Sequence, residues 1–135
     1  MPHDRPIPGS PGEWLAYAKR DLAMSASPLP KGGAYESLCF HAQQAAEKAI
    51  KAVYRARGQG FRYTHDLDDL LHGLERLGLD VPESLWEAAD LTRFAWEARY
   101  PSFAEAVSKE EYEQALALAE RVVEWAAAMV EGREP

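Results

Sequence analysis

Apolar residues recur along the chain with the spacing of amphipathic α-helices, most regularly between about Ala34 and Arg57. In this segment they fall at positions i, i+3, i+4 and i+7, which places them on one face of a helix. The segment contains no proline or glycine and is rich in alanine, a composition with high helix propensity, and Gly58 follows its end. The apolar stripe consists of Tyr35, Leu38, Cys39, Ala42, Ala46, Ala49, Ile50 and Val53. This pattern predicts a long helix with a continuous buried face.

The first and the last predicted helices begin with capping signals. Ser10 is followed by a proline and has Glu13 three residues after it, and Ser108 has Glu111 three residues after it. A serine N-cap with a glutamate three residues later satisfies the free amides at a helix start. Pro28 lies where the first helix must end. Beyond Ser108, apolar residues keep helical spacing for about five turns, which predicts a long C-terminal helix.

Two shorter helices are predicted between these. Thr64 is placed to cap a leucine-rich helix that ends at Gly78. Asp80, followed by an early proline, opens another helix that runs to about Arg99, because Pro101 disfavours helix at the residue before it. No segment alternates apolar and polar residues long enough to be a strand. The expected fold class is therefore all-α, an antiparallel bundle of four to five helices.

Length and composition fit a single domain, with residues 1–9 as an extended tail and residues 10–131 as the bundle. The chain has 135 residues, of which 47% are hydrophobic and 27% charged, a composition that excludes a disordered protein. No apolar run reaches the roughly 18 residues of a membrane span, and the N-terminus lacks the apolar stretch of a secretory signal. Cys39 is the only cysteine, which excludes an intrachain disulfide. We therefore expect a cytoplasmic protein.

The charge distribution sets one basic segment apart in an acidic chain. The net charge is −7, which argues against a protein that wraps long nucleic acid. No acidic residue occurs between Lys48 and His65. On a helical wheel, five polar residues gather nearly opposite the apolar stripe: His41, Gln44, Lys48, Lys51 and Arg55. This arc is either a recognition face for phosphate or a partner, or a solvated helix face on which Glu47 and Lys51 form an i, i+4 pair.

Other candidate chemistry is sparse. His65 precedes an aspartate, an arrangement found in acid–base and metal sites and also at ordinary helix starts. The four histidines lack ligand spacing such as His-Glu-x-x-His, so no metal is expected. Cys39 falls on the apolar stripe, and no nucleophile or phosphate-loop motif is present, so no cofactor is expected either. Arg99 and Tyr100 either end a helix or hold a phosphate.

Several apolar residues lie outside the main stripes of their helices. They are Phe40, Tyr54, Leu118 and Trp125. A helix with apolar contacts on more than one side is typical of a subunit interface. The pattern therefore predicts a homodimer or a higher homo-oligomer.

In combination, these residues resemble the HEPN family, the domain shared by higher eukaryote and prokaryote nucleotide-binding proteins. The resemblance runs from Glu13 to about Ala128 and is carried by Trp14, Ala18, the run from His41 to Ala52, Thr64-His65-Asp66-Leu67, and Ala98-Arg99-Tyr100-Pro101. It implies a dimeric bundle of four or five helices. Many prokaryotic members bind a minimal nucleotidyltransferase encoded beside them, in systems of the toxin–antitoxin type. Others are metal-independent ribonuclease toxins with an arginine, four to six residues, and then a histidine.

That ribonuclease motif is incomplete in this chain. Arg99 matches the arginine, but Ala104, Glu105 and Ala106 stand where the histidine is required, and no histidine follows. Cleavage at a 2′-hydroxyl needs a base and an acid near neutral pH, which histidine supplies best. The chain is therefore more consistent with a binding protein than with an enzyme.

The leading hypothesis is a non-catalytic HEPN protein that is the helical partner of a separate minimal nucleotidyltransferase. The residues expected to contact nucleotide, RNA or the partner are His41, Gln44, Lys48, Lys51, Arg55, His65, Arg99 and Tyr100. Lys48→Glu with Lys51→Glu is expected to leave the fold intact, because both side chains are predicted to point away from the apolar stripe. Two alternatives remain open: a divergent endoribonuclease that uses Arg99 and an unconventional base, and a purely oligomeric scaffold.

Overall fold

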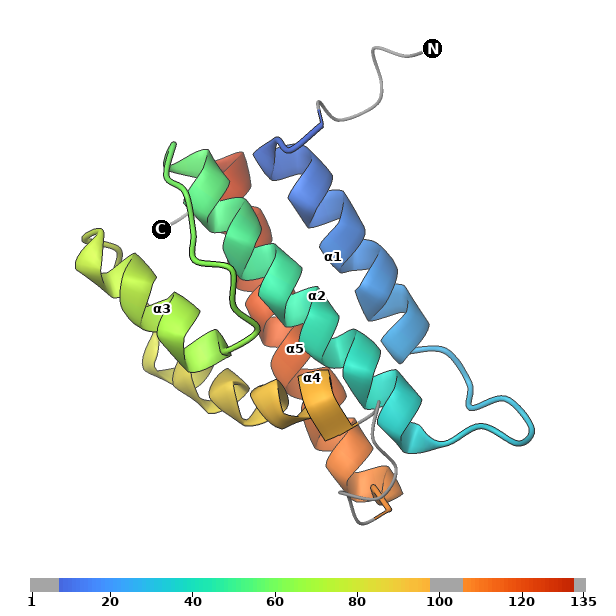
Figure 1. Cartoon of the computed structure of the whole chain (residues 1–135). Coiled ribbons are helices and arrows are strands. Elements are labelled where there is room, and N and C mark those ends of the chain that lie inside the picture. Colours follow the sequence, from blue (N-terminus) through green and yellow to red (C-terminus); the bar gives the residue numbers. More distant parts are fainter. Residues whose placement is uncertain (1–7, 98–105, 133–135) are drawn as a thin grey trace, which may run out of the picture.

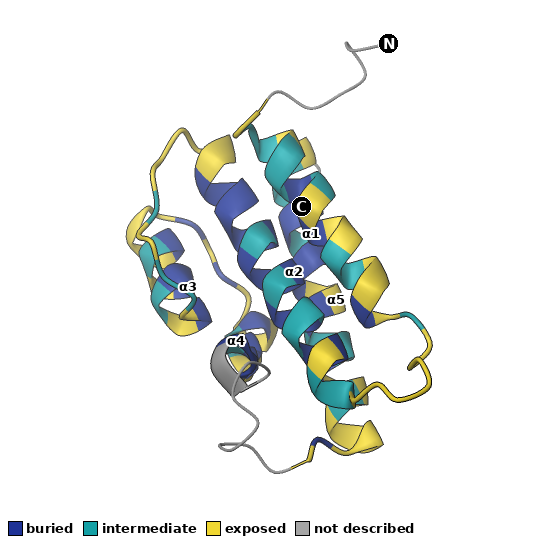
Figure 2. Ribbon diagram, turned by 45° about the vertical axis from the view of Figure 1, so that its right-hand side comes forward, coloured by how far each residue is buried: buried dark blue, intermediate teal, exposed yellow. Residues whose placement is uncertain are grey.

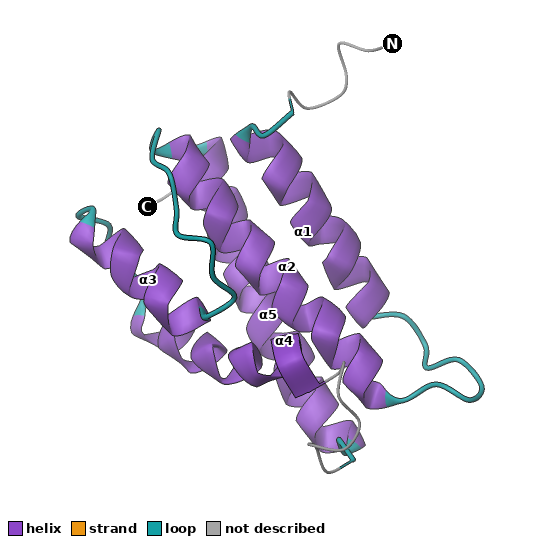
Figure 3. Ribbon diagram, viewed as in Figure 1, coloured by secondary structure: helices purple, strands orange, loops and turns teal. Residues whose placement is uncertain are grey.

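The computed structural model describes residues 8–97 and 106–132, with the backbone alone for Trp96 and Glu97. Within these ranges every regular element is a helix (Figure 3). The elements are α1 (Pro11–Ser25), α2 (Tyr35–Ala56), α3 (Leu67–Arg76), the 3₁₀-helix η2 (Glu83–Arg93), α4 (Phe94–Glu97) and α5 (Lys109–Glu131). The prediction of an all-α helical bundle is confirmed. None of the described helices is long and apolar enough to cross a membrane.

Helix α2 is the centre of the bundle. Figure 1 shows α1 packed antiparallel along one side of α2 and α5 behind it, whereas α3 and η2 lie on the opposite side from α1. The chain returns through α3, η2 and α4, so that α5 starts near the beginning of α2 and runs in the same direction. In consequence, α2 contacts every other helix of the structure.

Burial of α2 extends well beyond the predicted stripe. The stripe residues from Leu38 to Val53 are buried as expected, but Ala45 and Ala52, on other sides of the helix, are also fully buried. The positions left partly exposed along the middle of α2 form one narrow strip (Figure 2). Alanine on these faces allows α1 and α5 to approach α2 closely, which is why a single helix can be enclosed by its own chain.

Because α2 is enclosed within its own chain, Tyr54 does not support the predicted subunit interface. The Tyr54 side chain is only 6% exposed, and its hydroxyl donates a 2.6 Å hydrogen bond to the carbonyl oxygen of Leu70 on α3. It is therefore covered within its own chain, because α3 packs against this side of α2. Phe40, Leu118 and Trp125 are half-buried, and Leu118 and Trp125 pack against the core. Homo-oligomerisation stays a prediction, without Tyr54 as a reason for it.

The two serine caps form as predicted. The Ser10 hydroxyl accepts a hydrogen bond from the Glu13 amide at 3.2 Å. At the start of α5, the Ser108 hydroxyl accepts from the Glu111 amide at 3.1 Å, while the Glu111 carboxylate accepts from the Ser108 amide at 3.0 Å. These reciprocal bonds are a complete capping box.

The predicted cap of α3 is wrong by two residues. Asp66, not Thr64, is the N-cap, and its carboxylate accepts hydrogen bonds from the amides of Asp68 and Asp69. The Thr64 hydroxyl instead accepts from the Asp66 amide at 3.0 Å, so it stabilises the turn that leads into the cap. A carboxylate can accept from two amides at once and interacts favourably with the positive end of the helix dipole, which favours aspartate here.

The helix predicted to begin at Asp80 begins at Glu83 instead, and most of it has a different geometry. It is the 3₁₀-helix η2, its N-cap is Pro82, and no side chain caps it. Its buried residues, Leu85, Ala88 and Leu91, recur every third position. Residues at i and i+3 eclipse each other in a 3₁₀-helix, so this spacing turns all three toward the core. The predicted end of the helix near Arg99 lies outside the described residues.

Candidate recognition face

The structure divides the polar residues predicted from sequence into separate groups, and only some of these residues lie on the partly exposed strip of α2. One group is held by a carboxylate from α1, and a second is buried around a carboxylate of α2 itself. A third consists of arginines at the C-terminal end of α2 and in the connection that follows it. The three groups differ in exposure and in net charge, so each is described separately.

Asp21 of α1 contacts the strip near both of its ends, at His41 and at Lys48. One of its carboxylate oxygens lies 2.9 Å from Nδ1 of His41, and the other accepts a 2.6 Å hydrogen bond from the Lys48 ammonium group. The Asp21 side chain is 13% exposed, compared with 30% for His41 and 25% for Lys48. Lys48 therefore does not provide an isolated positive charge, because its neutralising carboxylate is built into the neighbouring helix.

Glu47 organises the buried second group. Its carboxylate accepts hydrogen bonds from Gln43 at 2.8 Å, from Lys51 at 2.9 Å and from Nδ1 of His65 at 2.8 Å. Gln44, on the partly exposed strip, donates to the side-chain oxygen of Gln43 at 2.6 Å. Two of the predicted site residues, Lys51 and His65, thus meet at one carboxylate, and Gln44 is linked to it through Gln43.

The position of Lys51 contradicts the prediction that its side chain points away from the core. The residue is 5% exposed, and its ammonium nitrogen lies 5.8, 5.1 and 6.0 Å from the ring centroids of Trp14, Phe61 and Tyr63. These rings come from α1 and from the connection between α2 and α3, which both close over this part of α2. Aromatic faces attract a cation, and they add to the ion pair with Glu47.

The hydrogen bonds around Glu47 make stability depend on pH. Burial alone would raise the pKa of Glu47, but the bonds from Lys51, Gln43 and His65 and the Lys51 charge hold it below its ordinary value of 4.5. A carboxyl group whose pKa is lowered by folding stabilises the protein above its unfolded-state pKa, and this contribution is lost as the pH falls.

We therefore predict that the free energy of unfolding decreases as the pH is lowered below about 4.5, and that Glu47→Gln reduces the slope of this decrease. Urea denaturation of both proteins at several pH values between neutral and acidic measures the difference. Because other carboxylates also titrate in this range, only the difference in slope is assigned to Glu47. Equal slopes in the two proteins would contradict the assignment.

The remaining predicted residues are dispersed. Arg55 is exposed, and its guanidinium carbon lies 5.0 Å from the centroid of the Phe61 ring. Arg62, which was not among the predicted site residues, has a 78% exposed side chain and a 3.2 Å ion pair with Asp69. Arg99 and Tyr100 lie outside the described residues. The structure therefore brings His41 close to Lys48, and Lys51 close to His65. It does not combine the predicted residues into a single basic face.

Neither a metal site nor a reactive thiol is found among the described residues of this region. No group of three histidine, cysteine, aspartate or glutamate side chains in the described ranges is placed to hold a metal ion. Burial raises the pKa of the Cys39 thiol to about 12, so it is protonated and unreactive near neutral pH. Asp21 is the residue of this candidate face that sequence reasoning missed. The only feature of the sequence that could have indicated Asp21 is its position seven residues after Trp14, which places both residues on the same side of α1.

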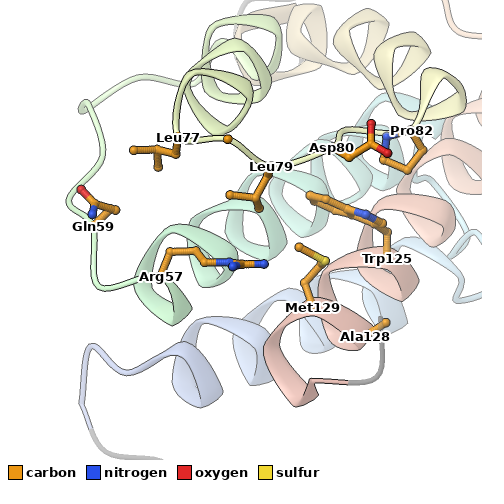
Figure 4. Close-up of a pocket in the computed structure, with 10 residues that line it drawn as sticks. Arg57, Gln59, Leu77, Leu79, Asp80, Pro82, Trp125, Ala128 and Met129 are labelled. Atoms are coloured by element: carbon orange, nitrogen blue, oxygen red, sulfur yellow. The ribbon is translucent and has the colours of Figure 1, made fainter. Parts of the chain in front are cut away.

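A separate groove lies between the C-terminal ends of α2 and α5 and the connection that leads into η2. It has a volume of about 510 Å³. Figure 4 shows Trp125 and Met129 of α5 on one side, Leu79 on the other, and the Arg57 side chain reaching toward Met129. The groove explains why Trp125 is only half-buried, because one part of the indole contacts the core and another part lines the groove.

These features define the protein as an all-helical bundle built around one central helix with a polar strip. The model of the HEPN domain family matches residues 12–130, and the chain belongs to this family. TT1696 from Thermus thermophilus has a similar structure, with 35% identity, a TM-score of 0.78, and coverage of 90% of this chain and 98% of that one. The archaeal HEPN homologue ST0689 has 25% identity and a TM-score of 0.71 over the same shares of the two chains. No curated protein matches the sequence.

Proposed function

We propose that the protein is a non-catalytic, cytoplasmic HEPN subunit that forms a homodimer and binds a separate minimal nucleotidyltransferase in a system of the toxin–antitoxin type. The contact surface consists of the polar residues of the partly exposed strip of α2, namely His41, Gln44 and Lys48. Membership in the HEPN family supports such a partner, since many prokaryotic members pair with this class of enzyme. The proposal assigns to the strip a role in binding a protein surface.

The proposal rests on two ion pairs, one on the strip and one buried beneath it. Asp21 neutralises Lys48, and Glu47 neutralises Lys51. Phosphate binding depends on cations that attract an anion, whereas a neutral surface with fixed hydrogen-bonding groups suits a complementary protein surface. The imidazole of His41 and the amide of Gln44 are each held by a neighbour. Little side-chain freedom is therefore lost when a partner binds.

The experiment is to mix the purified chain with the product of a short nucleotidyltransferase reading frame encoded beside it. Size-exclusion chromatography with light scattering should show a species heavier than either protein alone. Two proteins that elute separately at their own masses, or a genome without such a neighbouring frame, would contradict the proposal. A mass of 15.1 kDa for the chain alone would contradict the homodimer.

One observation favours a second candidate, the divergent ribonuclease. The carboxylate of Asp21 lies against Nδ1 of His41, and a carboxylate in this position orients an imidazole for proton transfer through its other nitrogen. The proposed binding role predicts that the purified protein leaves single-stranded and structured RNA intact in the absence of metal. Cleavage that is lost in both His41→Ala and Arg99→Ala would establish the enzyme instead.

A further inference from the structure

The groove between the C-terminal ends of α2 and α5 shares no residue with the α2 strip. Its volume of about 510 Å³ lies within the roughly 300–1,000 Å³ that is usual for sites that bind small molecules. Such sites have mostly apolar walls and a few polar groups that select the ligand. The groove has this composition, because its largely apolar lining also includes the charged side chains of Arg57 and Asp80 (Figure 4).

The walls of the groove present an aromatic ring and a thioether to a ligand. Trp125 packs partly against the core, and Met129 follows it one turn later on α5. Leu79 faces these two residues from the connection that leads into η2 (Figure 4), and it is itself buried. The apolar body of a ligand can therefore lie between α5 and Leu79. Tryptophan is also the aromatic side chain that attracts a cation most strongly.

Three helix ends make the groove favourable for a positive charge. Arg57 and Leu77, which line it, are the C-cap residues of α2 and α3. Ala128 and Met129, which also line it, belong to the last turn of α5, and this turn (residues 128–131) contains no basic residue. The C-terminal end of a helix carries a partial negative charge that attracts cations. The ends of α2, α3 and α5 therefore act together on a ligand in the groove.

The two charged side chains of the lining lie apart from each other. Figure 4 shows the Asp80 carboxylate beyond the indole of Trp125, whereas the Arg57 guanidinium reaches toward Met129. Arg57 already interacts with another residue of the chain, so an anionic ligand has to compete for it. A cationic ligand at the other end meets an exposed carboxylate, an indole ring and the helix ends together.

We propose that this groove binds a small organic cation, with its ammonium group paired with Asp80 and its apolar body held between Trp125 and Leu79. The carboxylate supplies a charge-assisted hydrogen bond, and the indole adds a cation–π attraction. The net charge of −7 draws such a ligand toward the protein as a whole. The inference goes beyond the proposed function, because it concerns a different ligand and a different surface and does not depend on a nucleotidyltransferase.

The test uses three probes that carry the same phenyl ring and differ in charge at neutral pH. They are 2-phenylethylamine, which is a cation, 2-phenylethanol, which is neutral, and phenylacetate, which is an anion. An NMR titration follows the indole N–H resonances of the intact protein, and the resonance of Trp125 is the one missing from Trp125→Phe. The amine should shift this resonance and bind about tenfold or more tightly than the other two probes.

Asp80→Asn should weaken binding of the amine about tenfold, because it removes the paired carboxylate. Glu113→Gln is the matched control, since it also removes one negative charge but lies at an exposed position near the start of α5. It should bind the amine as well as the unchanged chain does, and circular dichroism should show equal helicity for both variants. The proposal is overturned if the amine does not bind, if the alcohol or phenylacetate binds as tightly, or if both variants weaken binding equally.

Discussion

Lys51→Glu is expected to lower the free energy of unfolding by about 3–5 kcal/mol, the usual cost of leaving a buried charge without its partner. The new carboxylate would be buried beside Glu47, among three aromatic rings that favour a cation. Repulsion between the two carboxylates adds to the lost ion pair, so the variant is expected to be partly unfolded at room temperature. Urea denaturation followed by circular dichroism measures the change.

Two further variants separate this effect from a general effect of charge. Lys48→Glu, at a partly exposed position three residues earlier, is expected to cost about 1 kcal/mol. Lys51→Met combined with Glu47→Gln removes both buried charges together and should be much less destabilising than Lys51→Glu, because no unpaired charge remains. If Lys51→Glu and Lys48→Glu were equally mild, Lys51 would have to be exposed, as the helical wheel alone suggested.

Gly73→Ala is expected to destabilise the protein by about 1–3 kcal/mol, although alanine normally stabilises a helix. A Cβ atom at Gly73 would lie 2.0 Å from the Tyr54 hydroxyl oxygen. The hydroxyl cannot retreat freely, because it donates a hydrogen bond to Leu70 and the tyrosine is buried. The added methyl group therefore forces α3 away from α2 or displaces the ring. Thermal and urea denaturation both report this loss.

A double variant provides the control for Gly73. Without the hydroxyl group, the nearest Tyr54 atom to the new Cβ would be the ring carbon at 3.2 Å, a tight contact that a small shift can relieve. Tyr54→Phe should therefore make Gly73→Ala much less harmful than it is in the unchanged protein. Additive losses in the double variant would show that the two residues do not collide.

Local signals in the sequence predicted the parts of the fold that depend on neighbouring residues. The caps at Ser10 and Ser108 form because each serine hydroxyl accepts a hydrogen bond from the amide of the glutamate three residues later, without help from the rest of the chain. The 3₁₀ geometry of η2 was missed because apolar residues at i and i+3 suit both kinds of helix over two turns. Which geometry forms is decided by packing against α3 and α5, which a local pattern does not contain.

The arrangement of charges on the candidate face could not be predicted from a helical wheel. The wheel placed Lys48 and Lys51 on one side of α2, but the register between α1 and α2 brings Asp21 to Lys48 and Trp14 to Lys51. The connection after α2 then covers Lys51 with Phe61 and Tyr63. Both effects arise from contacts between segments distant in sequence, so a predicted basic surface became a neutral strip and a buried ion pair.

A calorimetric titration with the nucleotidyltransferase subunit tests most directly whether the α2 strip is a binding face for that subunit. The strip variant is Gln44→Ala with Lys48→Ala. The control is Glu120→Ala with Glu124→Ala, which changes exposed residues of α5. We predict that the strip variant binds about tenfold or more weakly than the unchanged chain, whereas the control binds equally well. Equal affinity of the strip variant and the unchanged chain would contradict the claim.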